Sequence, residues 1–178
     1  MATPERRKHL VHTGASAAIG LFTGPAADSS AIAEYRRLTG EALTKEVRAL
    51  LALSHGDSAS ARRALAEPDS AQMKYMYLAY RRPLAAQAYY LLGDYHATLR
   101  SLEDFRPEAL RVGSFDSRWG MLGRVRLLRA AALERLGRRA EARQEYREVL
   151  AQWRTADPAL QPFVRQAQQG LARVGTAG

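Results

Sequence analysis

The fold of this chain can be predicted from one stretch, Arg129-Ala-Ala-Ala-Leu-Glu-Arg-Leu-Gly137-Arg-Arg-Ala-Glu-Ala142-Arg-Gln-Glu-Tyr146-Arg-Glu-Val-Leu150. It consists of a segment rich in residues that favour helix, a glycine, and a second segment of the same kind. Glycine adopts the left-handed conformation of a helix C-cap without steric cost, so Gly137 is expected to end the first helix. After it, apolar residues recur at three- and four-residue spacing, at Ala142, Tyr146, Val149 and Leu150. The stretch therefore predicts a helical hairpin with one apolar face on its second helix.

The same turn pattern occurs twice more, at Gly56 and Gly93. His-Gly-Asp-Ser at 55–58 and Leu-Gly-Asp-Tyr at 92–95 correspond to Leu-Gly-Arg-Arg at 136–139. We therefore predict three hairpins, at about residues 41–66, 83–105 and 119–154. Ser58 is expected to cap the second helix of the first hairpin.

Residues 69–80 are expected to form a separate helix, and a new helix is expected to start at Arg81-Arg82-Pro83. Pro83 suits the first turn of the helix that follows it.

Small residues stand at matching positions around the three turn glycines, and bulky residues stand between them. Seven residues before each glycine lie Ala49, Ala86 and Ala130, and five after it lie Ala61, Thr98 and Ala142. Nine residues after each glycine lie Leu65, Leu102 and Tyr146, and four before it lie Ala52, Tyr89 and Leu133. Small residues at helix crossings with bulky ones between them are typical of stacked helical hairpins.

The end of the predicted domain is a helix over residues 158–174, followed by a tail at 175–178. Asp157 before Pro158 is a typical helix start. The helix has one apolar side, with Gln and Arg on the other. This is the pattern of a capping helix that covers the end of a repeat stack.

A small residue followed four positions later by an aromatic one, after a glycine turn, resembles the second half of the tetratricopeptide (TPR) repeat. The string from Asp116 to Val174 is similar to the C-terminal TPR segment of bacterial signalling proteins such as membrane-linked serine/threonine kinases. The resemblance implies an all-α fold, a right-handed α-solenoid of about three TPR-like repeats plus the capping helix, and a protein-interaction role. The glycine spacings of 37 and 44 residues exceed a TPR unit of about 34 residues, so insertions are expected.

The resemblance does not carry over kinase activity, because no Gly-rich phosphate loop, H-R-D loop or D-F-G site is found. The four histidines are scattered, and no nucleophile–base pair is visible from spacing. We expect no catalysis, no cofactor and no metal, although His9 and His12 form an H-x-x-H pair.

The composition is 47% hydrophobic and 25% charged, as in a folded soluble protein, and the 178 residues include no cysteine. No run of apolar residues is long enough to span a membrane. The net charge is +9, and residues 123–178 contribute 11 basic and 5 acidic residues, interleaved along the sequence. The alternative function is therefore a nucleic-acid-binding helical repeat that uses this Arg-rich last repeat.

Residues 1–27 precede the predicted repeat domain, which covers residues 28–174. They are expected to be a flexible leader of a cytoplasmic protein. Arg6 and Arg7 before a weakly apolar stretch also leave open a twin-arginine export signal.

The first helix of each hairpin in a TPR-like stack faces a concave groove that binds a peptide or a partner helix. With the turn glycines as register, the groove candidates are Glu46, Leu50, Tyr80, Gln87, Tyr90, Arg124, Leu127, Glu134 and Arg135. We expect Tyr80, Gln87, Tyr90, Arg124, Glu134 and Arg135 to bind the partner, since tyrosine and arginine often anchor interfaces. Self-association through the apolar face near residues 43–53 is a further alternative.

Overall fold

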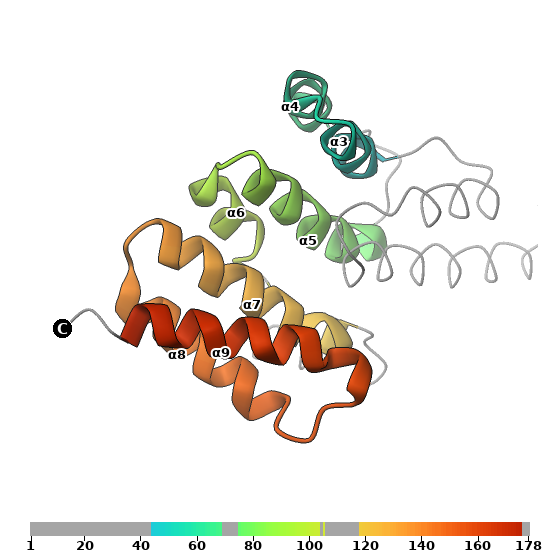
Figure 1. Ribbon diagram of the computed structural model, residues 1–178. Coiled ribbons are helices and arrows are strands. Elements are labelled where there is room, and N and C mark those ends of the chain that lie inside the picture. The colour runs from blue at the N-terminus through green and yellow to red at the C-terminus, as the bar shows by residue number, and fades with distance from the viewer. Residues whose placement is uncertain (1–43, 69–74, 104, 106–117, 176–178) are drawn as a thin grey trace, which may run out of the picture. The chain divides into compact units, whose positions relative to one another are not determined.

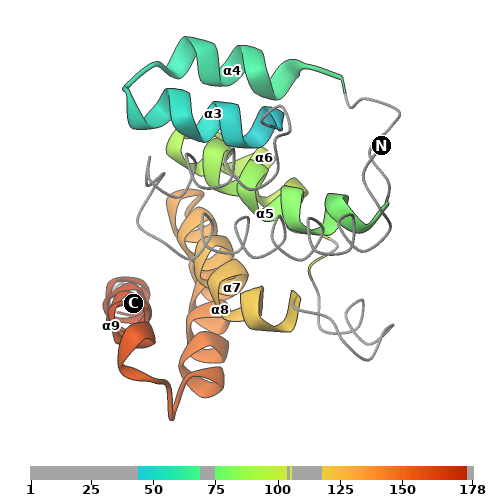
Figure 2. The same ribbon diagram turned by 90° about the vertical axis from the view of Figure 1, so that its right-hand side faces the viewer.

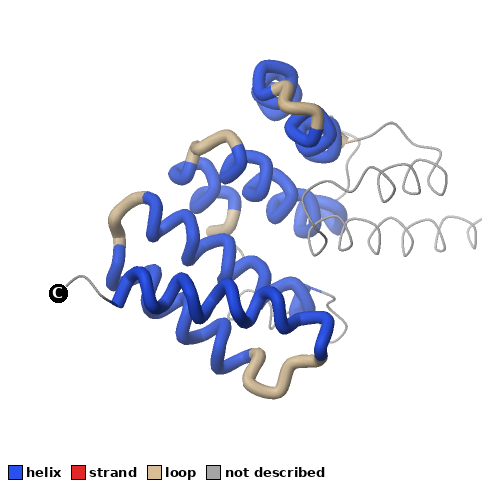
Figure 3. Tube along the Cα trace, viewed as in Figure 1, coloured by secondary structure: helices blue, strands red, loops and turns tan. Residues whose placement is uncertain are grey.

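The computed structural model describes residues 44–68, 75–103, 105 and 118–175 (Figure 1). Every element in these residues is a helix, which confirms the predicted all-α class (Figure 3). The predicted leader, residues 1–27, lies outside the described residues. The chain divides into two compact units, residues 1–92 and residues 93–178, and each is described separately below.

The first unit contains helices α3 (Lys45–Ser54), α4 (Ser58–Ala66) and α5 (Tyr75–Leu91). Helices α3 and α4 lie side by side as a hairpin (Figure 2), and α5 packs against α3. Thr44 caps α3, since its hydroxyl accepts a hydrogen bond from the Val47 amide at 3.4 Å. Asp57 caps α4, since its carboxylate accepts from the Ser60 amide at 2.9 Å. The prediction that Ser58 is this cap was wrong by one residue. The turn between α3 and α4 places the carboxylate of Asp57 against the backbone amides of the first turn of α4, which have no partner within the helix.

Helix α5 runs through Pro83 without a break, so the predicted restart at Arg81-Arg82-Pro83 was wrong. A proline inside a helix removes one backbone hydrogen bond and costs about 3 kcal/mol. The structure holds this segment by a tertiary contact just before the proline. The guanidinium of Arg81 is buried and donates two hydrogen bonds to the carboxylate of Glu46 on α3, at 2.9 and 2.7 Å.

The second unit contains α6 (Tyr95–Ser101), α7 (Arg118–Arg135), α8 (Arg139–Gln152), the short 3-10 helix η2 (Pro158–Leu160) and α9 (Gln161–Gly175). Helices α7 and α8 form a hairpin, α9 packs against both of them, and α6 packs against α7 (Figure 1). The predicted capping helix is thus present, but its first turn is 3-10, and Asp157 makes no side-chain cap there.

The core of the second unit lies between α7, α8 and α9. Its buried members are Leu127, Ala130, Leu133, Ala142, Tyr146, Val149, Trp153, Ala167 and Val174. The apolar side predicted for residues 158–174 packs on this core through Leu160, Phe163, Val164 and Leu171. Alpha9 therefore covers the hairpin, with Gln and Arg on its exposed side.

All three turn glycines adopt positive φ, at 76° for Gly56, 78° for Gly93 and 73° for Gly137. The first and third turns also share their hydrogen bonds. After α3, the Gly56 amide donates to Leu53 and the Asp57 amide to Ala52, at 3.0 and 2.9 Å. After α7, the Gly137 amide donates to Glu134 and the Arg138 amide to Leu133, at 3.1 and 2.9 Å. This is the Schellman motif in both places, so the two hairpins turn in the same way.

Most of the predicted packing positions around the glycines are buried; Ala52 and Tyr89 are only half-buried. Ala49, Ala86, Ala130, Ala61, Thr98 and Ala142 are fully buried, and Leu65, Leu102 and Tyr146 are also in the core. The repeat pattern read from the glycine positions therefore identifies core residues around each turn glycine. This finding supports a helical-repeat character.

Candidate functional site

Three of the predicted partner-binding residues, Tyr80, Gln87 and Tyr90, lie on α5 in the first unit. The side chain of Tyr80 is outside the described part of the structure. Gln87 and Tyr90 are both half-buried, and Oε1 of Gln87 accepts no hydrogen bond from the described residues. They are three positions apart on α5, so they project from the same side of the helix.

Arg135 is an exposed predicted binding residue at the C-terminal end of α7. Its guanidinium lies 5.9 Å from the centre of the Tyr95 ring, at the outer range of a cation–π contact. Tyr95 is the first residue of α6, which packs against α7. The arginine is thus oriented by a neighbouring helix while its charge stays accessible to a partner.

Glu134 lies next to Arg135 and joins three helices. Its carboxylate accepts a hydrogen bond from the Tyr146 hydroxyl on α8 at 2.7 Å, and two from the Arg173 guanidinium on α9 at 2.6 and 3.0 Å. The hydrogen bonds from Arg173 and then from Tyr146 lower the pKa of Glu134 below its ordinary value. The arrangement makes Glu134 a structural residue that fixes α9 on the hairpin.

Arg124, also on α7, lies against the capping helix. Its guanidinium carbon lies 3.8 Å from the centre of the Phe163 ring on α9. Burial lowers the pKa of Arg124 to about 10, so the group is still charged at neutral pH. Next to it, Gly123 faces the indole of Trp153, and a Cβ at this glycine would be 2.3 Å from Cζ2. Arg124 therefore contributes to the packing of α9.

Three of the groove candidates do not offer a side-chain surface. Leu50 and Leu127 are in the cores of their units, and Glu46 is buried in its ion pair with Arg81. Counting from the turn glycines had placed Leu50 and Leu127 outside the core. Both face inward because the apolar side of each helix is wider than that count assumed. The expectation that these three residues face a groove was wrong.

Part of the basic charge of the second unit is used inside the unit. Arg126 and Arg129 on α7 contact the Glu145 carboxylate at 3.2 and 3.3 Å. Arg129 also donates to the carbonyl oxygens of Leu102 and Phe105, at 2.6 and 3.1 Å, which ties α6 and the turn after it to α7. These arginines are consequently packing residues, and the net charge of the segment overstates its free basic surface.

Sequence reasoning missed one surface, the arginines of α8. We call Arg139, Arg143 and Arg147 the arginine face, because their four-residue spacing places them within about 80° of the helix circumference. The glutamates of α8, Glu141, Glu145 and Glu148, lie on the opposite side. Acidic and basic residues that are interleaved in sequence are thus separated in space, and a helical projection of residues 139–152 would have found this.

None of the helices in the described residues is long and apolar enough to cross a membrane. The same residues contain no group of three or more His, Asp or Glu side chains positioned to hold a metal ion.

Comparison of the chain with protein-family models, with curated proteins and with solved structures finds no match in any of the three.

Proposed function

We propose that this chain is a TPR-like helical-repeat adaptor that binds a protein in a concave groove, either as an extended peptide or as a partner helix. Its hairpins would stack as a right-handed α-solenoid, with α9 as the capping helix. The groove would be lined by the first helices of the hairpins, which include α5 and α7. The sequence resemblance to TPR segments of bacterial signalling proteins makes a signalling protein the first partner to test.

The observation that carries this proposal is the repeated hairpin. The turns at Gly56 and Gly137 share a left-handed glycine and both hydrogen bonds of the Schellman motif, although they are 81 residues apart in the chain. Alanines at matching positions are fully buried on both sides of each turn, at Ala49, Ala61, Ala130 and Ala142. Helical hairpins of one design, each burying a face on its neighbour, build the extended binding surfaces of repeat proteins.

Among the six predicted binding residues, Tyr90 and Arg135 support this function best. Arg135 is exposed and oriented by its contact with Tyr95. Tyr90 is half-buried, so part of a large rigid side chain is accessible near the C-terminal end of α5. Glu134 and Arg124 contribute indirectly, because they hold α9 against the hairpin.

Site-specific photo-crosslinking in a lysate of the source cell tests the groove. A photo-reactive residue is placed at position 90 or 135, and in matched controls at Ala59 on α4 or Gln144 on α8, which are exposed on second helices. We expect one protein to crosslink to positions 90 and 135 and not to the controls. The variant Tyr90→Ala/Arg135→Glu should lose capture of that protein while keeping its helical circular dichroism.

Equal crosslinking at the control positions would contradict the groove assignment. Adducts of the chain with itself would indicate self-association in place of an adaptor function. Nuclease-sensitive capture would favour the nucleic-acid alternative, in which binding falls steeply between low and physiological salt.

A further inference from the structure

The arginine face of α8 is a basic surface on a different helix from the proposed groove residues of α5 and α7. Arg139 and Arg147 are exposed, and neither has a carboxylate within ion-pair distance among the described residues. The nearest basic neighbour in sequence, Arg138, is different, since it pairs with Glu141 at 2.5 Å. The arginine face therefore carries charge that the unit does not neutralise itself.

The central residue of this face is fixed in place. Arg143 is half-buried, and its guanidinium donates a hydrogen bond to the carbonyl oxygen of Val174 at 2.8 Å. This carbonyl belongs to the last turn of α9, where the helix dipole favours a cation. Nε of Arg143 is buried and has no hydrogen-bond partner in the described part of the chain. One positioned guanidinium thus stands between two exposed ones.

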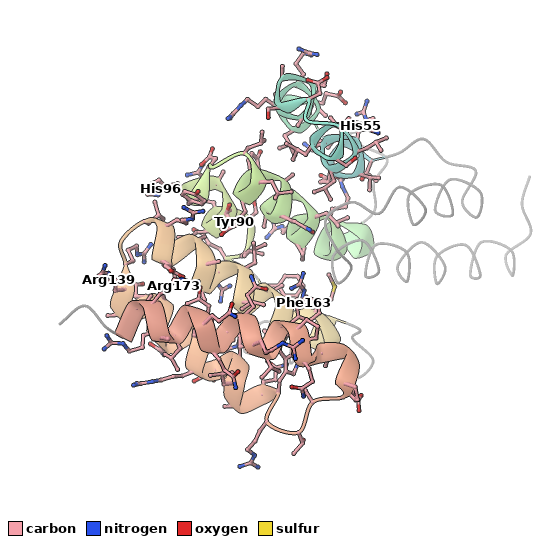
Figure 4. All side chains as sticks on the ribbon, viewed as in Figure 1. His55, Tyr90, His96, Arg139, Phe163 and Arg173 are labelled. Atoms are coloured by element: carbon pink, nitrogen blue, oxygen red, sulfur yellow. The ribbon has the colours of Figure 1, made fainter. Side chains whose placement is uncertain are left out.

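The neighbouring helix adds no acidic side chain to this surface. The sequence of α9, Gln161–Gly175, includes Arg165 and Arg173 but no aspartate or glutamate. Arg154, which is exposed in the turn after α8, continues the basic surface along the chain. Figure 4 shows Arg139 and Arg173 at the end of the unit where α7 meets α8.

We propose that the arginine face binds an acidic segment of a partner protein, with carboxylates spaced to match the arginines. Side chains four residues apart on a helix lie about 6 Å apart, so a partner helix with glutamates at i, i+4 and i+8 can pair with Arg139, Arg143 and Arg147 in register. The forked guanidinium favours planar carboxylates through paired hydrogen bonds.

Two observations favour a protein partner over a nucleic acid. Single-stranded nucleic acid is usually held by basic residues together with aromatic side chains on which bases stack. The one aromatic residue of α8 is Tyr146, which is fully buried. The arginine face also offers three guanidinium groups, fewer than the roughly 6–10 phosphate contacts that make binding to DNA steeply salt-dependent.

The experiment uses the full chain and a fluorescein-labelled 15-residue alanine-based peptide with glutamates at i, i+4 and i+8, monitored by fluorescence anisotropy. A peptide of the same composition with the glutamates in scrambled order and a 15-nucleotide thymidine oligomer are measured beside it. The test variant is Arg139→Gln/Arg147→Gln. The control variant is Arg63→Gln/Arg100→Gln, which removes the same charge from two exposed arginines elsewhere.

We expect the test variant to weaken binding of the patterned peptide roughly tenfold, and the control variant to weaken it less than about twofold. The scrambled peptide should bind more weakly than the patterned one. Equal losses in the two variants, or equal binding of the two peptides, would show unspecific charge attraction and overturn the proposal. Tighter binding of the oligonucleotide, lost in the test variant, would assign the face to nucleic acid instead.

This surface can be tested separately from the proposed groove. Tyr90→Ala, the half of the groove variant that changes no charge, should leave binding of the acidic peptide within about twofold of the original, because it lies on α5 and removes no arginine. Failure of the groove proposal and failure of the arginine-face proposal would thus be seen in different variants.

Discussion

The ring of Tyr146 on α8 lies directly against Gly170 on α9, so close that a Cβ at this glycine would be 2.2 Å from Cζ of the ring. The absence of a side chain at Gly170 lets α9 approach the hairpin, and the approach places Arg173 beside Glu134. The position of the capping helix therefore depends on one glycine in its interior.

The first prediction is that Gly170→Ala destabilises the chain by about 1–3 kcal/mol, because the added methyl group must displace a buried ring. Without this contact the substitution would stabilise a helix interior by about 1 kcal/mol, so the sign of the effect is diagnostic. Urea unfolding followed by circular dichroism measures it. The control is Gly175→Ala at the end of the same helix, where a Cβ would meet nothing within 4 Å.

Gly175→Ala should change the free energy of unfolding by less than about 0.5 kcal/mol. In the double variant Gly170→Ala/Tyr146→Leu, the smaller side chain at position 146 leaves room for the added methyl group. Amide exchange in α9 should therefore be slower than in Gly170→Ala alone. A Gly170→Ala variant as stable as the original chain would contradict this packing.

The second prediction concerns the buried ion pair of Glu46 and Arg81, whose side chains are 4% and 8% exposed. Glu46→Gln should lower the free energy of unfolding by about 3–5 kcal/mol, because it removes the carboxylate that pairs with a buried guanidinium. Urea unfolding and amide exchange in α3 report the loss. The matched control is Arg48→Gln, which breaks the surface pair with Glu67 on the same hairpin and should cost less than about 1 kcal/mol.

A double variant, Glu46→Leu/Arg81→Met, should be more stable than Glu46→Gln, because it removes both buried charges together. Equal costs for Glu46→Gln and Arg48→Gln would mean that the Arg81 pair is not buried in solution.

The sequence was sufficient to predict the features that depend on local chemistry. Only glycine takes a positive φ cheaply, so the turns at Gly56 and Gly137 follow from the residue type. Small residues at fixed distances from those turns, such as Ala130 and Ala142, have to be buried where the helices cross.

Features that depend on a partner far along the chain were not predictable in the same way. The continuity of α5 through Pro83 is one case, since the Arg81 contact with Glu46 spans 35 residues of sequence. Gly170 is another, because nothing local distinguishes it from a helix-terminating glycine, and its role is set by the ring of Tyr146.

The predicted binding residues show the same difference between what local sequence reveals and what distant contacts decide. Residue type singled out Arg135, Arg124 and Glu134 as candidates, but their contacts decide what each does. Arg135 stays exposed, whereas Glu134 is held by Tyr146 and Arg173, and Arg124 lies on Phe163.

The third prediction is a pH dependence that arises from Glu134. Its pKa is lowered in the folded chain, first by the hydrogen bonds from Arg173. Its stabilising contribution is therefore complete above the ordinary glutamate value of 4.5 and is lost as the pH falls through the lower folded pKa. Glu134→Gln should cost about 1–2 kcal/mol at pH 7, a modest value because the Arg173 side chain is 56% exposed.

Urea unfolding of the original chain and of Glu134→Gln between pH 7 and pH 3 checks this dependence. The difference in free energy of unfolding should be constant above pH 4.5 and shrink below it. Tyr146→Phe, which removes one donor to the carboxylate, should shift the decrease to higher pH. A difference that grows on acidification would mean that the carboxylate is not stabilised by these donors.

The fourth prediction tests whether the hairpins are repeats of one design. Gly56→Ala and Gly137→Ala should each cost about 1–2 kcal/mol, since a Cβ meets no atom within 4 Å at either turn and the cost comes from the left-handed backbone alone. Asparagine tolerates this conformation better, so Gly56→Asn and Gly137→Asn should each cost less than the alanine variant. Urea unfolding and amide exchange in each hairpin measure the four variants.

Matched losses at two positions 81 residues apart would show that one backbone geometry governs both turns. A large loss at Gly137 with none at Gly56 would mean that the first hairpin does not depend on its left-handed turn. The two hairpins would then be unrelated elements with similar sequences, and the adaptor proposal would lose the observation that carries it. The arginine face would be unaffected, because its charges belong to α8 alone and need no repeat to be displayed.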